Sequence, residues 1–213
     1  MGNRRLPVYI LLDTSGSMRG EPIHSVNVGL QVMLSALRQD PYALESAHLC
    51  LITFDIEARI SLPLTPLDQV RFPEVSVPDA GATFMGAALQ LLIECVDREV
   101  KKSTSDSKGD WRPLVFIMTD GSPSDLHAFR EIIPEIKKRN FGSIIACAAG
   151  PKAKLQYLHE LTDRVVTVDT MDSTAFSGFF KWVSASVSVG SSSSGLTSQI
   201  SLPPPPSEVQ IVF

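Results

Sequence analysis

The segment Asp13–Ser17 (DTSGS) offers the clearest set of side chains for metal chemistry in this chain. It directly follows a short apolar run, Val8 to Leu12, which is typical of a buried strand. One carboxylate and two hydroxyl groups therefore leave the end of a strand together, and Gly16 is expected to let the backbone turn so that both hydroxyls aim at one point. All of these donors are oxygens and only one is charged, a set that suits a hard cation such as Mg²⁺.

Two further segments carry oxygen donors at comparable places. A strand predicted to begin at Leu114 ends in Thr119-Asp120-Gly121, and Thr83 lies in a glycine-led loop just ahead of a predicted helix. In open α/β sheets, ligands bind beyond the carboxyl ends of the strands, at the point where the strand order reverses. The sequence therefore predicts that one cation is surrounded by oxygens from five residues, namely Asp13, Ser15, Ser17, Thr83 and Asp120.

Each member of this set also has an ordinary structural interpretation. Asp13 can cap the following helix, and the two serines can be turn residues. Thr83 can be a helix N-cap, and Asp120 can belong to a turn. Asp55 and Asp125 are expected near the same rim, where they either tune partner choice or are solvated loop carboxylates. The joint occurrence of the five residues at the ends of the right elements favours the metal site.

The elements that must position these residues alternate between apolar runs and amphipathic segments. Strands are predicted over residues 8–12, 47–54, 58–64, 114–118, 143–149 and 165–168, and helices over 23–37, 85–101, 126–138, 152–162 and 174–187. This alternation predicts an α/β fold, a doubly wound, mostly parallel six-stranded sheet with helices on both faces. Only three residues separate the second and third strands, which indicates a hairpin and one antiparallel edge strand. Pro134 is expected to kink or split its helix.

The composition changes near residue 190. Residues 1–189 are predicted to form one domain, and residues 190–213 a Ser/Pro-rich C-terminal tail. The run Pro203–Pro206 is expected to be extended. The last five residues can pair as a strand or dock on the domain, but a flexible tail is favoured.

Charge and cysteine usage restrict the partners and the compartment. The 213 residues carry a net charge of -4 without a dominant basic face, which argues against nucleic-acid binding. The three cysteines lie far apart in apolar stretches and fit reduced thiols, so a cytoplasmic location is expected. No run approaches the roughly 20 apolar residues that a membrane span needs.

The order of the motifs (D-x-S-x-S, then G-x-T before a helix, then a strand ending in T-D-G) resembles that of a von Willebrand factor A (VWA) domain. This resemblance covers roughly residues 6–189 and implies a Rossmann-like fold with a metal-ion-dependent adhesion site at those five positions. By resemblance, Ser15 and Ser17 bind Mg²⁺ directly (Mn²⁺ or Ca²⁺ being alternatives), while Asp13 and Asp120 act largely through water. Thr83 is the member expected to move between direct and water-bridged contact.

The same resemblance implies a function. The remaining coordination position is filled by an Asp or Glu of a protein partner, so a non-enzymatic protein-binding module is expected. The stretch LPVYILLDTSGSM, followed by GEPI, is most similar to bacterial proteins of the tellurium-resistance TerY type. Relatives of that type are associated with stress-response systems that contain a kinase and a phosphatase, which implies a regulatory scaffold.

Enzymatic alternatives fit the sequence less well. A metal-dependent phosphohydrolase also places an aspartate after the first strand. Haloacid-dehalogenase enzymes, however, need a second aspartate two residues later, where this chain has Ser15. A phosphate-binding glycine loop and a G-x-S-x-G nucleophile elbow are both missing from the sequence. No catalytic residue is therefore predicted.

Overall fold

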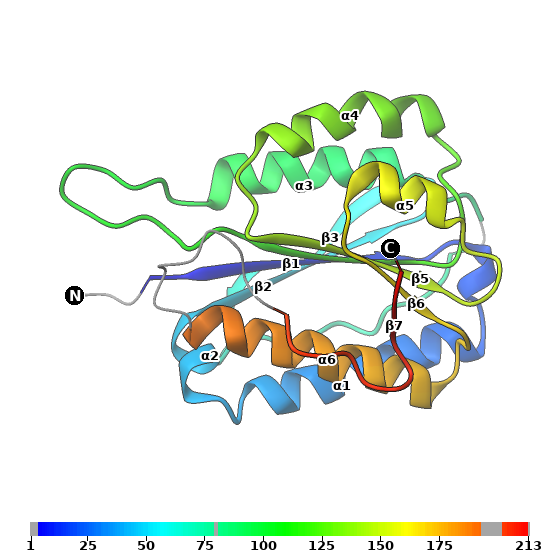
Figure 1. Cartoon of the computed structure of the whole chain (residues 1–213), viewed down its shortest axis with the longest axis horizontal. Helices are drawn as coiled ribbons and strands as arrows, with labels where there is room; N and C mark the ends of the chain where they lie inside the picture. Colours follow the sequence, from blue (N-terminus) through cyan, green and yellow to red (C-terminus); the bar gives the residue numbers. More distant parts are fainter. Residues whose placement is uncertain (1–3, 79–80, 193–201, 213) are drawn as a thin grey trace.

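The computed structural model describes residues 4–78, 81–192 and 202–212. Within these ranges one sheet passes between two layers of helices (Figure 1). The strand order is β3-β2-β1-β4-β5-β6-β7, with β3 and β7 antiparallel to their neighbours and the five inner strands parallel. The strands are β1 (Leu6–Asp13), β2 (Ala47–Phe54), β3 (Ala58–Pro66), β4 (Leu114–Thr119), β5 (Ser143–Ala149), β6 (Val165–Val168) and β7 (Gln210–Val212).

The helices are divided between the two faces of the sheet. In Figure 1, α3, α4 and α5 lie above the sheet, and α1, α2 and α6 lie below it. A single turn of 3-10 helix, η1, follows the loop after β1. The bounds are η1 (Gly16–Met18), α1 (Glu21–Leu37), α2 (Pro41–Ser46), α3 (Met85–Glu99), α4 (Leu126–Lys138), α5 (Leu155–Leu161) and α6 (Ser173–Ser192).

This architecture confirms the doubly wound α/β fold but corrects the expected sheet. The prediction of six strands with one antiparallel edge was wrong, because the described residues form seven strands with an antiparallel strand at each edge. The added strand, β7, comes from the segment predicted to be a flexible tail. Trp182 Nε1 donates a hydrogen bond of 2.9 Å to the Pro203 carbonyl, and the Val209 side chain is buried. These contacts bring the chain to β6, whose edge would otherwise leave backbone groups unpaired.

Other differences from the predicted elements are local. Helix α4 is not split at Pro134, which lies on its exposed side, where the carbonyl left without a partner can meet water. The short helix α2 was not predicted, and its start is capped by Asp40. Much of the Ser/Gly-rich stretch lies outside the described residues, so the division of the chain at residue 190 stays a prediction.

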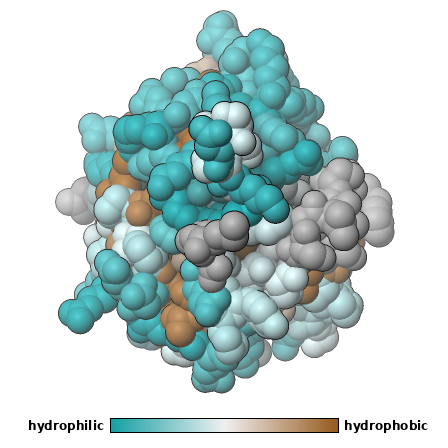
Figure 2. Space-filling view, turned by 90° about the vertical axis from the view of Figure 1, so that its left-hand side faces the viewer, coloured by the Kyte–Doolittle hydropathy of each residue, from teal (hydrophilic) through white to brown (hydrophobic). Residues whose placement is uncertain are grey.

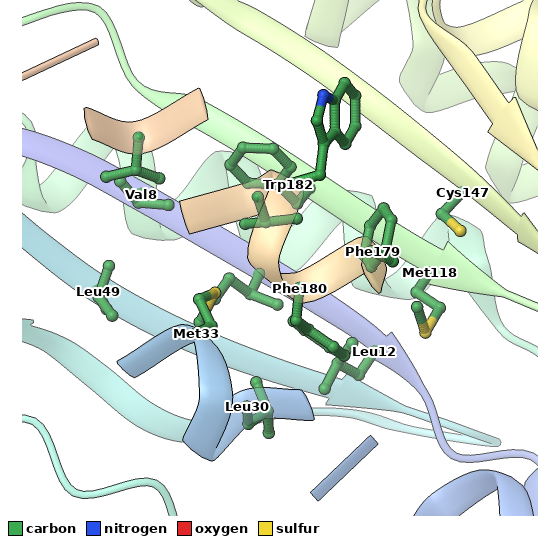
Figure 3. Packing of buried hydrophobic residues seen from close by; sticks show 14 of the residues in the cluster. Val8, Leu12, Leu30, Met33, Leu49, Met118, Cys147, Phe179, Phe180 and Trp182 are labelled. Carbon is green, nitrogen blue, oxygen red and sulfur yellow. The ribbon is translucent and has the colours of Figure 1, made fainter. Parts of the chain in front are cut away.

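Alternating side chains of the central strands enter two separate cores. Val8 and Leu12 of β1 join the core between the sheet and the helices α1 and α6. Tyr9 and Leu11 join the core on the opposite face, between the sheet and the helices α3, α4 and α5. Figure 3 shows the first of these cores, in which Phe179, Phe180 and Trp182 of α6 share one cluster with side chains of the sheet and of α1. A Cβ atom at Gly29 would lie 2.2 Å from the ring of Phe180, so the two helices approach closely only because position 29 has no side chain. The strands β1 and β4, which end at the candidate site, are thus packed into a core on each face of the sheet.

One face of the molecule is mostly polar. Figure 2 shows the face at the amino ends of the parallel strands, which is mostly hydrophilic with small, separate apolar areas. Within the described part of the chain, no helix has the length and apolar content to cross a membrane.

Candidate functional site

The candidate site lies where the strand order reverses. From β1 the chain continues to β2 on one side, whereas β4 lies on the other side and leads on to β5 and β6. The connections after β1 and β4 therefore diverge at the carboxyl ends of the strands, at the right of Figure 1, which is where open α/β sheets bind ligands. The loops that carry Asp13 and Asp120 are these two.

Asp13 is fully buried at the end of β1, and both of its carboxylate oxygens accept hydrogen bonds. Ser15 N donates to Oδ1 over 2.8 Å, and Thr119 Oγ1 donates to Oδ2 over 2.6 Å. Burial raises the pKa of Asp13 to about 6, against the opposing effect of the donors Thr119 and Ser15, and the charge of Asp120 raises it further. A carboxylate held in this way is fixed in orientation and costs free energy to ionise.

The two serine hydroxyls and Asp120 form a chain of oxygen atoms. Ser15 Oγ lies 3.3 Å from Ser17 Oγ, and Ser17 Oγ donates to Asp120 Oδ1 over 2.9 Å. Ser15 and Asp120 are buried, whereas Ser17, which contacts both of them, is exposed, so the chain of oxygens reaches the surface at Ser17. Met18, fully buried at the end of η1, anchors the loop in the core.

Gly16 acts differently from the prediction. Among the described residues only Gly20 and Gly150 have positive φ, so Gly16 does not use the left-handed region that glycine favours. Instead, a Cβ atom at Gly16 would lie 3.4 Å from Gly81 Cα. The loop after β1 therefore lies beside the segment that leads to Thr83, at a distance where a side-chain carbon at position 16 would make an ordinary contact.

Thr83 joins the set from a third segment. Its Oγ1 lies 3.3 Å from the place that a Cβ atom would take at Gly121, the residue after Asp120. Thr83 N donates to Ser124 Oγ over 3.0 Å, and Ser124 N donates to the Thr83 carbonyl over 2.8 Å. This reciprocal pair fixes Thr83 against the loop after β4, so all five predicted residues lie in three adjoining loops.

Four supporting residues carry roles that the sequence analysis did not assign to them. Thr119 bonds to Asp13, and Ser124 bonds to Thr83. Asp125 Oδ1 and Oδ2 accept from Gly86 N and Ala87 N, over 3.1 and 2.9 Å, and so cap α3. Thr83 is therefore not the side-chain cap of that helix. Asp55 is buried and paired with Arg59 over 3.1 Å. The alternative of solvated loop carboxylates was wrong for both aspartates, which are tied to residues of other segments or strands.

The donor set fits a small, hard cation. Neighbouring ligands of an octahedral Mg²⁺ ion at 2.0–2.1 Å lie about 3 Å apart, close to the oxygen–oxygen distances of 2.9 and 3.3 Å found here. Within the described ranges, no group of three or more His, Cys, Asp or Glu side chains could hold a metal ion. Any cation held by this cluster would therefore depend on hydroxyl oxygens beside the carboxylates of Asp13 and Asp120.

A family comparison agrees with the fold and with the span of the motifs. The family model of the von Willebrand factor type A domain matches residues 8–177. The chain belongs to the von Willebrand factor type A (VWA) domain family. No curated protein sequence matches the chain.

Solved structures share the fold of this VWA domain. Proximal thread matrix protein 1 from the mussel byssus is 16% identical, with a TM-score of 0.62 over 88% of this chain and 46% of that chain. A second structure of that protein is described as having a zinc-occupied MIDAS motif. A von Willebrand factor type A protein from Catenulispora acidiphila is 18% identical, with a TM-score of 0.60 over 87% of this chain and 43% of that chain. The chain thus spans about half the length of these structures or less, and at such identities the likeness shows the fold alone.

Proposed function

We propose that this VWA domain is a non-enzymatic protein-binding module that captures an acidic residue of its partner through a divalent cation. The cation is Mg²⁺, with Mn²⁺ or Ca²⁺ as alternatives, and its ligands come from Asp13, Ser15, Ser17, Thr83 and Asp120. The observation that carries the proposal is the convergence of oxygen donors from three loops, joined by the Ser17–Asp120 hydrogen bond, at the switch point of the sheet. Domains of this family are protein-interaction modules that commonly bind a divalent metal.

The hydrogen bonds of the site support different roles for its members. Both oxygens of Asp13 already accept from protein donors, which favours contact with the cation through water. The hydroxyls of Ser15 and Ser17 bond to side chains of the site and not to a backbone group, so they are suited to direct contact with the cation. A cation with few directly bound carboxylates keeps a strong attraction for another anion. An Asp or Glu of the partner would therefore gain a charge-assisted contact.

The first test measures binding of Mn²⁺ by electron paramagnetic resonance. We expect wild type to bind one ion and Ser15→Ala to bind much more weakly. Ser122→Ala is the matched control, because Ser122 is an exposed serine of the loop after β4 outside the proposed set. Equal binding by all three proteins would contradict the proposed ligands.

The second test determines whether binding requires a carboxylate of the partner. Displayed peptides are selected against the Mn²⁺-loaded protein, and we expect the selected sequences to contain Asp or Glu. Replacing that residue by its amide, or adding a chelator, should abolish capture. Peptides that bind equally well in both forms would contradict capture through the cation.

We also propose that the domain has no phosphohydrolase activity. A phosphoryl acceptor must be reached by its substrate, whereas Asp13 is fully buried and each of its oxygens is held by a hydrogen bond from the protein. Turnover of a generic phosphoester with Mg²⁺ that disappears in Asp13→Asn would overturn this part of the proposal.

The biological setting rests on the narrower resemblance. The TerY-like sequence supports a cytoplasmic bacterial protein that acts in a stress or tellurium-resistance system, with a kinase or phosphatase among its partners. The test is whether such an enzyme of the same organism binds the Mg²⁺-loaded protein and is released by chelation.

A further inference from the structure

The end of β2 is bonded to both of the neighbouring loops that carry candidate ligands. The Phe54 carbonyl accepts a hydrogen bond of 2.8 Å from Thr14 N, the residue after Asp13. The next carbonyl, that of Asp55, accepts a hydrogen bond of 2.7 Å from Phe84 N, the residue after Thr83. Two consecutive peptide groups therefore set the spacing between the loops.

The side chain of Asp55 fixes the direction of those peptide groups. Its Oδ1 accepts from Glu57 N over 3.2 Å, and its Oδ2 accepts from Arg59 Nη1 over 3.1 Å. Together with the bond of 3.0 Å from Asp55 N to the Glu57 carbonyl, these contacts close the tight turn between β2 and β3. The closed turn holds the carbonyl of Asp55 where it accepts from Phe84 N.

The same carboxylate also reaches the loop after β1. Thr14 Oγ1 lies 3.3 Å from Asp55 Oδ2 and 3.1 Å from the Phe54 carbonyl. Thr14 and Asp55 are both buried, whereas the Arg59 side chain is about half exposed, at 51%. A cavity of about 260 Å³, lined in part by Thr14, Asp55 and Arg59, lies beside this cluster.

We propose that Asp55 is a positioning residue of the candidate metal site. It acts through Thr14 on the loop of Ser15 and Ser17, and through Phe84 on Thr83, so that ligands from two segments keep the spacing a small cation requires. This inference rests on the proposed metal-binding function. Residues that orient metal ligands without touching the ion typically change metal affinity 10- to 100-fold when they are replaced.

A purely structural ion pair is the competing explanation. The Asp97–Arg139 pair serves as its example, because Arg139 Nε and Nη2 bond to the two oxygens of Asp97 over 3.0 and 2.6 Å. That pair joins α3 to the residue after α4, and neither side chain bonds to a site loop. Asp97→Asn is therefore a matched control for loss of an Asp–Arg pair.

The test measures two properties of the full chain carrying Asp55→Asn. The first is Mn²⁺ affinity, which should fall about 10- to 100-fold. The second is hydrogen exchange of the Phe84 and Thr14 amides in the chelated protein, which should accelerate. Thr14→Val should weaken Mn²⁺ binding as well, and the double variant should lose less than the product of the two single effects.

The controls separate positioning from general destabilisation. Asp97→Asn and the core substitution Ile145→Val should leave Mn²⁺ affinity and the two amides unchanged, even where they lower the melting temperature. Wild-type affinity and unchanged exchange in Asp55→Asn would overturn the positioning role while leaving the metal site intact. Wild type that binds no Mn²⁺ would overturn the proposed function instead, and unchanged Phe84 and Thr14 exchange would then also remove the positioning role.

Discussion

Ser17 and Asp120 are joined by a hydrogen bond of 2.9 Å although they are 103 residues apart in the chain. The bond connects the loops after β1 and β4, which are adjacent parallel strands. It is made outside the strands, at the point where their helical connections diverge, so it is supported by the sheet but is not part of its ladder. This contact joins two of the five residues of the proposed cation site across the two loops.

The buried carboxylate of Asp13 gives the chelated protein an unusual pH dependence. Its pKa of about 6 lies above the ordinary value near 4, so the folded state binds this proton more tightly than the unfolded state. The free energy of unfolding should therefore fall as pH rises from about 4 to about 6, by roughly 3 kcal/mol at most. The charged neighbour is Asp120, while Thr119 and Ser15 supply the opposing hydrogen bonds.

Asp13→Asn tests how much the ionisation of buried Asp13 destabilises the metal-free protein. In the presence of chelator at pH 7.5, we expect it to be more stable than wild type by about 1–3 kcal/mol, with the difference vanishing toward pH 4. Urea unfolding at a series of pH values measures both quantities. A variant that is less stable than wild type at every pH would show that ionised Asp13 stabilises the metal-free fold.

Much of the site was predictable because its residues sit at strand ends. The apolar runs identified β1 and β4, and Asp13 and Asp120 follow from them directly, as do the adjacent serines. The hydrogen bonds from distant residues that hold the site loops in place could not be predicted from the sequence. The Asp125 cap bonds to Gly86, 39 residues earlier in the chain, and no local pattern announces such a partner.

The sheet edge shows the same limit. β7 is three residues long, too short for an alternation of apolar and polar residues to predict a strand. Its pairing depends on Trp182 and Val209, which become partners only after the chain has folded back over α6. Composition favoured a flexible tail, and tertiary contacts overrode it.

Gly86 should not tolerate a side chain, although replacing a glycine in a helix by alanine ordinarily stabilises the helix. A Cβ atom there would lie 2.5 Å from Phe129 N and 2.7 Å from Asp125 Oδ2. We expect Gly86→Ala to lower the free energy of unfolding by about 2–3 kcal/mol, since α4 must move away and the cap of α3 is disturbed. Denaturant unfolding measures the loss. Gly16→Ala, whose Cβ would meet an ordinary contact at 3.4 Å, should cost much less; equal losses would contradict the steric argument.

The C-terminal strand should depend on one indole hydrogen bond. Trp182→Phe keeps an aromatic ring but removes the donor to the Pro203 carbonyl, at a cost of about 1 kcal/mol. We expect faster hydrogen exchange in β7, with the central strands unaffected. The other tryptophan, Trp111, stacks with Arg4 just ahead of β4, which β5 and β6 separate from β7, so Trp111→Phe is the control that should leave β7 unchanged. Unchanged exchange in both variants would mean that the strand is held by its pairing with β6 alone.

The central claim is that the five residues hold a cation, and thermal unfolding tests it most directly. Mg²⁺ is added to the chelated protein at about 100 times its dissociation constant, where binding contributes roughly 2.7 kcal/mol. For a domain of this size the melting temperature should rise by about 5–10 °C in wild type, and by far less in Ser15→Ala. A rise of the same size in both proteins, or none in either, would contradict the proposed site.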